Sequence, residues 1–162
     1  MTRTAFVKHG GNGFWVYDVA GSVFLWFLIK VANKQLELHD EPWLRDSIQR
    51  WRVSAVVTEL AHYADNDWTT SQVDTVIQLS QHAIEAIRLH GDFAASDAQS
   101  WPVLDDKRIF ARGHDPIPAE PVARLGEAYV QLLQGELPPQ LDQHAWFFSL
   151  EPEIDTLKMR SS

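Results

Sequence analysis

The sequence predicts a mainly helical, single-domain protein built as a bundle of about four main helices. Three observations support this class. The chain of 162 residues has the length of one domain, 45% of its residues are hydrophobic, and apolar residues recur at helical spacing in four long segments. We therefore expect residues 1–162 to fold as one helical domain around a shared core.

The first predicted element is a short N-terminal β-hairpin. Residues 5–8 and 14–17 are the candidate strands, and residues 9–13, which contain an Asn-Gly pair, form the turn between them. Asn-Gly between apolar segments is a strong short-range hairpin signal. The alternative is that the first helix already begins near Phe14.

The first predicted helix runs from about Asp18 to Leu38 and is apolar on nearly all sides, which is typical of a helix in the centre of a bundle. Asp18 is expected to cap its free amides. We do not expect the stretch 14–32 to cross a membrane. Asp18 and Lys30 interrupt it, and residues 19–29 are too short for about 30 Å of hydrocarbon.

The second predicted helix begins at Pro42, because proline suits the first helical turn, and continues to about Tyr63. Asp40 or Glu41 is expected at its N-cap. The turn-forming residues 65–67 follow its end.

The third predicted helix has the clearest boundaries. Thr69 and Gln72 have capping-box spacing at its start, and Gly91 is placed to end it. The apolar stripe between them consists of Val73, Val76, Ile77, Ser80, Ile84 and Ile87.

Residues 92–118 lack periodicity and predict a long, partly ordered loop. The fourth helix is predicted over residues 119–134 and ends at Gly135. The aromatic run 146–150 predicts either a strand or a core plug, because periodicity cannot separate the two. The expected loop anchors are Trp101, Val103, Leu104, Ile109 and Phe110.

Charge is distributed unevenly along the chain. Residues 1–60 carry a formal balance of +1 and residues 61–162 a balance of −9, which gives the net charge of −8. Such an acidic surface attracts basic partners and repels nucleic acid, because binding of nucleic acid needs clustered Lys and Arg. The chain has no cysteine, and residues 1–13 do not resemble a signal peptide. We therefore expect a cytoplasmic protein.

The predicted partner-binding residues combine carboxylates with nearby aromatic side chains. Aromatic residues supply contact area in interfaces, while carboxylates steer and pair with Lys or Arg. The alternative is that the acidic residues only solubilise the fold and the tryptophans belong to the core. The set consists of Asp65, Asp67, Trp68, Asp97, Trp101, Asp105, Asp106, Glu151, Glu153 and Asp155.

A metal-dependent helical-bundle enzyme is the second hypothesis. Glu59 and His62 have the Glu-x-x-His spacing found in such bundles, and His82 and Glu85 show the reverse order. The second copy and the additional glutamates of a complete site are missing, and a mononuclear site including His144 matches no short zinc motif. No phosphate loop or nucleophile elbow is present. We expect no catalytic residues and no cofactor.

The chain resembles an immunity protein of a bacterial contact-dependent growth inhibition or other polymorphic toxin system. The resemblance lies in its size and acidity and in the aromatic-rich stretches 14–17, 24–27, 41–44 and 146–150. It implies a cytosolic protein that binds one cognate toxin domain, such as a basic nuclease, and blocks its active site or substrate channel. A regulatory or scaffold domain without a toxin partner is the remaining alternative.

Overall fold

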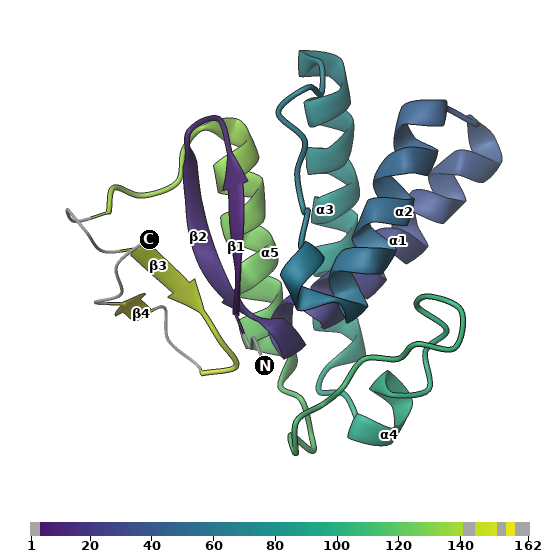
Figure 1. Cartoon of the computed structure of the whole chain (residues 1–162), viewed down its shortest axis with the longest axis vertical. Coiled ribbons are helices and arrows are strands. Elements are labelled where there is room, and N and C mark those ends of the chain that lie inside the picture. Colours follow the sequence, from purple (N-terminus) through teal and green to yellow (C-terminus); the bar gives the residue numbers. More distant parts are fainter. Residues whose placement is uncertain (1–3, 141–144, 152–154, 158–162) are drawn as a thin grey trace.

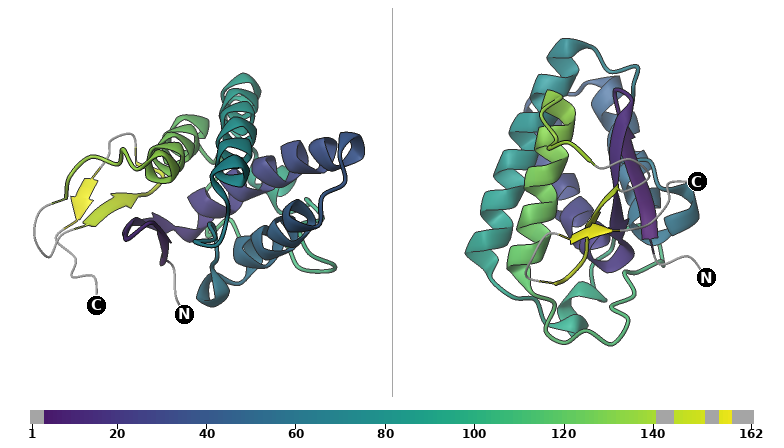
Figure 2. Two further views of the ribbon diagram at one scale, coloured as in Figure 1. Left: turned by 90° about the horizontal axis from the view of Figure 1, so that it is seen from above. Right: turned by 90° about the vertical axis from the view of Figure 1, so that its left-hand side faces the viewer.

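The computed structural model describes residues 4–140 and 145–151, and the backbone of 155–157. As predicted, the protein is mainly helical with about four main helices and an N-terminal hairpin. The helix α5 lies between α3 and a small sheet, and α1 and α2 lie on the other side of α3 (Figures 1 and 2). No helix in these described ranges has the length and apolarity that a bilayer crossing requires.

The predicted hairpin is confirmed. The strand β1 (Thr4–His9) pairs antiparallel with β2 (Asn12–Tyr17), so the alternative in which a helix begins near Phe14 is wrong. Gly10 and Gly11 form the turn with φ angles of +59° and +81°. Two consecutive positive φ angles suit a two-residue hairpin turn, and glycine adopts them without steric cost.

The aromatic run near the C-terminus contributes a strand. The strand β3 (Ala145–Phe148) pairs in parallel with β2 and antiparallel with β4 (Asp155–Leu157), which gives the sheet order β1-β2-β3-β4. Phe14 and Phe148 meet edge to face, with ring centroids 5.0 Å apart. This contact packs the strand β2 of the hairpin against the strand β3.

The helix α1 (Asp18–Leu38) is the buried central helix that its composition predicts, but its predicted cap is wrong. Tyr17 is the N-cap residue and makes no side-chain cap bond. The Asp18 carboxylate instead pairs with the Arg112 guanidinium at 2.7 Å, because a close cation binds it more strongly than neutral amides do.

The helix α2 (Pro42–Val56) has Glu41 at its N-cap, as expected, and ends before the predicted Tyr63. A short 3₁₀ helix, η1 (Thr58–Leu60), and an extended segment follow. The segment folds back on α2, where the buried Trp51 indole donates a hydrogen bond of 2.9 Å to the Tyr63 carbonyl. A helix continuing to Tyr63 could not make this contact.

The helices α3 (Thr70–His90) and α5 (Ala119–Gln134) match their predicted boundaries. Thr69 and Gln72 form the predicted capping box. The two helices pack closely at Gly126, where an added Cβ would lie 2.6 Å from the Ile84 side chain.

The segment 92–118 contains the short helix α4 (Ala95–Ala98) and is anchored largely as predicted. Val103 and Ile109 are buried, whereas Phe110 is 66% exposed, so its predicted anchoring role is wrong. Ile109 and Ala111 on either side fill the core instead, which leaves Phe110 facing solvent.

Candidate functional site

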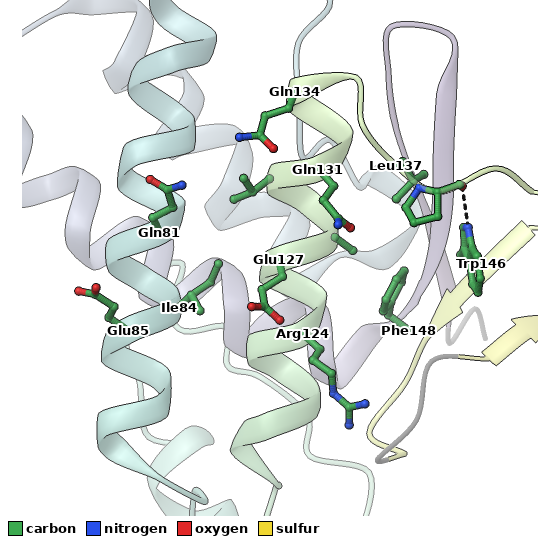
Figure 3. Close-up of a pocket in the computed structure, with 13 residues that line it drawn as sticks. Gln81, Ile84, Glu85, Arg124, Glu127, Gln131, Gln134, Leu137, Trp146 and Phe148 are labelled. Atoms are coloured by element: carbon green, nitrogen blue, oxygen red, sulfur yellow. Dashed lines mark hydrogen bonds between the residues drawn. The ribbon is translucent and has the colours of Figure 1, made fainter.

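Two hollows lie beside each other on the surface formed by α3 and α5. The first, the α5 groove, has a volume of about 690 Å³ and lies between α3, α5 and β3 (Figure 3). The second, the turn cleft, has a volume of about 730 Å³ and lies between the hairpin turn, the start of α3 and the end of α5. Gln134 lines both hollows, and we call the combined surface the α3–α5 face.

A single stripe of α3 lines both hollows. Residues three and four positions apart lie on one side of a helix, so this stripe places both hollows on the same side of α3. The α3 residues concerned are Thr70, Val73, Asp74, Ile77, Gln81, Ile84 and Glu85.

The α5 groove has an apolar floor and a polar rim. Gln81 and Glu85 of α3 and Glu127 and Gln131 of α5 line this rim, and Figure 3 shows the Glu85 carboxylate directed away from α5. The Trp146 indole from β3 closes the far side and donates a hydrogen bond of 3.0 Å to the Pro138 carbonyl. The apolar lining consists of Ile84, Ala128, Val130, Leu137, Pro138, Trp146 and Phe148.

Arg88 neutralises part of the acidic charge beside the groove. Arg88 of α3 pairs with Glu120 at 2.9 Å and with Glu127 at 3.2 Å, both on α5. Hydrogen bonds from Arg88 lower the pKa of the Glu120 carboxyl. Nε of Arg124 is buried and has no hydrogen-bond partner among the described residues. Glu85, by contrast, is exposed and forms no ion pair within residues 4–140 and 145–151.

The turn cleft carries carboxylates on two of its walls. Asp74 lies in α3 and Glu136 follows α5, and both are exposed. Neither forms an ion pair with another described residue. The half-buried Val73 and Ile77 and the buried Leu133 supply apolar surface between them. The cleft can therefore bind an amphipathic cation.

His9 is the titratable base that lines the turn cleft. Burial lowers the pKa of its imidazole, and the nearby Asp65 carboxylate only partly opposes this effect. The ring is therefore largely neutral at pH 7 and adds little positive charge to the cleft. The backbone N–H of Gly10 donates a hydrogen bond of 3.1 Å to Asn66, which joins the hairpin turn to the segment before α3.

The predicted site residues around Trp68 lie next to this cleft. Trp68 is half-buried and lines the cleft, but it packs against Trp43 and Trp51, each with a centroid separation of 6.4 Å. Asp65 pairs with Arg50. A hydrogen bond from the backbone N–H of Asp67 and, to a smaller extent, the pairing with Arg50 lower the pKa of the Asp65 carboxyl. Trp68 is thus both a wall of the cleft and part of the core.

The second predicted group lies at the opposite end of the molecule, where α4 is located (Figure 1). Asp97, Asp105 and Asp106 are exposed. Trp101 is half-buried and stacks on Trp26 at 5.7 Å with an angle of 14° between the ring planes. The structure therefore does not bring this group together with the residues around Trp68.

The third predicted group follows β3. Glu151 is exposed, Glu153 lies outside the described residues, and only the backbone of Asp155, in β4, is described. The described carboxylates of the predicted partner-binding set thus occupy separate parts of the fold.

The residues of the predicted metal site are also separated. Glu59 lies in η1 and His62 in the extended segment after it, so the two do not share a helix face. His82 and Glu85 are exposed on α3, and His144 is outside the described residues. Within the described ranges, no three His, Asp or Glu side chains are grouped to hold a metal ion.

Most of the α3–α5 face was not predicted from the sequence. Glu85 appeared only as a possible metal ligand, and Asp74, Glu127 and Glu136 were not considered. A signal was present, because charged and amide residues recur every three or four positions along the exposed side of α5. These residues are Glu120, Arg124, Glu127, Gln131 and Gln134.

Comparison with protein-family models, with curated proteins and with solved structures gave no match to this chain.

Proposed function

We propose that this chain is a non-catalytic binding protein of the immunity type, which neutralises a basic protein toxin such as a nuclease. The observation that carries the proposal is the unneutralised acidic charge of the folded chain after residue 60. The exposed carboxylates of that part with no ion pair to another described residue are Asp67, Asp74, Glu85, Asp92, Asp97, Asp105, Asp106, Asp115, Glu136 and Glu151.

Uncompensated charge of one sign acts over distance. It steers a cationic protein toward the surface and raises the association rate, and both effects weaken as salt increases. An acidic inhibitor can also occupy the phosphate-binding surface of a nuclease. The same charge repels nucleic acid itself, which favours a protein partner.

We assign the contact to the α3–α5 face. Steering alone does not hold a complex, because affinity depends on apolar area buried in well-packed pockets. The α5 groove offers such area at Ile84, Trp146 and Phe148, with Glu85 on its rim. The acidic residues near α4 do not border either hollow of this face.

The test is co-expression with the toxin domain encoded by the adjacent reading frame. The proposal predicts cell survival and a complex whose association slows as salt rises. The charge-reversed variant E85K should bind more slowly, whereas E37K, on the exposed end of α1, serves as a matched control. Cell death without a complex, or a complex insensitive to salt and to E85K, would contradict the proposal.

A further inference from the structure

We infer that the turn cleft receives an arginine side chain of the partner protein. This inference rests on the proposed function, because it names the chemistry of one contact in the same complex. It is carried by the juxtaposition of Asp74, Glu136 and Trp68 in one hollow between three chain segments.

The charge of the turn cleft favours a cation. Asp74 and Glu136 come from different walls of the cleft, and both lack an ion-pair partner in the described part of the chain. Among the described residues, no lysine or arginine lines the cleft, and burial holds His9 largely neutral. The described walls of the cleft therefore present negative charge without a cation.

The end of α5 strengthens this potential. The C-terminal end of a helix carries partial negative charge, which cations stabilise. The last turn of α5 contains no basic residue, and Leu133 and Gln134 from this turn line the cleft. A cation from another molecule can therefore take the place that a C-terminal lysine or arginine usually fills.

The walls of the turn cleft suit a long side chain with a planar cationic end. Val73, Ile77 and Leu133 offer apolar surface for the methylene groups of a long side chain, and Trp68 adds an aromatic wall. A guanidinium group stacks on aromatic rings and binds carboxylates through two parallel hydrogen bonds. Arginine fits this combination better than lysine, whose ammonium is compact and strongly hydrated.

The walls of the turn cleft are held in place by hydrogen bonds within the chain. The capping box of Thr69 and Gln72 fixes the start of α3, and the Trp68 indole donates a hydrogen bond of 3.2 Å to Ser47 Oγ. The hydrogen bond from Gly10 to Asn66 holds the hairpin turn against the same segment. The walls are thus set before a ligand arrives, which lowers the entropic cost of binding.

The test uses N-acetyl-arginine amide as the probe and follows the amide and indole resonances of the full chain by NMR. The inference predicts saturable shifts at the Trp68 indole and at Gly10, Gly11 and Asp74. The neutral isostere N-acetyl-citrulline amide should produce no saturable shift. N-acetyl-lysine amide should bind more weakly than the arginine probe.

Two variants separate the cleft from general attraction to an acidic protein. D74N and E136Q should each raise the dissociation constant of the arginine probe by about threefold to fivefold, as expected for loss of one ion pair to an exposed carboxylate. D97N removes one negative charge in α4 and should change the dissociation constant of the arginine probe by less than twofold. Spectra of the free variants that superimpose on the wild type away from the substitution show that each one folds.

Absence of a saturable shift, equal binding of citrulline or lysine, or equal affinity of D74N, E136Q and wild type would each overturn the inference. These results do not depend on the toxin. Arginine binding by a chain that forms no toxin complex would contradict the immunity function alone. A toxin complex formed by a chain that does not bind arginine would contradict the cleft assignment alone.

Discussion

The regions around Trp68 and Trp101 look alike in sequence but differ in structure. In both, a tryptophan packs into the core, on Trp43 and Trp51 in one case and on Trp26 in the other. Exposed carboxylates stand near both. The first region opens into a large hollow, because the hairpin turn, the start of α3 and the end of α5 meet there.

The difference shows that carboxylates next to aromatics in the chain do not by themselves make a binding surface. What distinguishes the two regions is concavity, together with carboxylates that distant segments bring to the same hollow. Asp74 and Glu136 are 62 positions apart in the chain and line one cleft. The predictions below test whether the two regions share a structural role and differ in binding.

The largest expected effect is the loss of stability on removing either tryptophan. W68A and W101A should each lower the free energy of unfolding by about 2–4 kcal/mol, because each leaves a cavity beside packed aromatic rings. Urea denaturation of both variants measures the change. F110A should stay within about 0.5 kcal/mol of wild type, because Phe110 is exposed. A loss below about 1 kcal/mol in W68A or W101A would contradict their placement in the core.

The second effect concerns the ion pair of Asp18 with Arg112, which joins the loop after α4 to the start of α1. Asp18 and Arg112 are only 14% and 11% exposed, so D18N removes a carboxylate charge that pairs with a poorly solvated guanidinium. We expect a loss of about 2 kcal/mol. The control D40N breaks the exposed pair of Asp40 with Arg45 and should cost at most about 1 kcal/mol. Equal losses in the two variants would show that the loop does not depend on this pair.

The third effect separates the two regions by binding. The double variant D74N/E136Q should reduce the affinity for the toxin domain by about tenfold or more at low salt. D105N/D106N removes the same formal charge from the loop after α4 and should change the affinity by less than about threefold. Titration calorimetry compares the two variants directly. A larger loss in D105N/D106N would move the binding surface to the α4 end.

The smallest effect is a pH dependence at the turn cleft. Burial lowers the pKa of His9 in the folded chain, so the unfolded chain takes up a proton at higher pH than the folded chain does. His9 therefore contributes stability above a pH of about 6.5, and this contribution decreases as the pH falls below that value. H9Q should weaken the loss of stability between about pH 7 and pH 5. Parallel stability curves for H9Q and wild type would refute this role.

The boundaries of the long helices followed from local signals. The capping box at Thr69, the glycines at Gly91 and Gly135 and the apolar stripes act within a few residues, so the chain itself specifies them. The early end of α2 was missed because it depends on the Trp51 contact with Tyr63. The prediction that Asp18 caps α1 was wrong because it also depended on a tertiary contact, since the partner of Asp18, Arg112, lies far along the chain.

The candidate site was harder to predict because its residues come from separate segments. Trp68 and its neighbouring carboxylates were found from composition, but the cleft beside them requires the packing of the hairpin against α3 and α5. Phe110 was misplaced because only tertiary packing decides which of three adjacent apolar residues faces outward.

The most direct test of the central claim is amide hydrogen exchange of the chain, free and bound to the toxin domain. The account predicts slower exchange on binding in the exposed first turns of α3 and around the end of α5, with no change in residues 95–112. Slower exchange confined to residues 95–112, or none along the α3–α5 face, would contradict it.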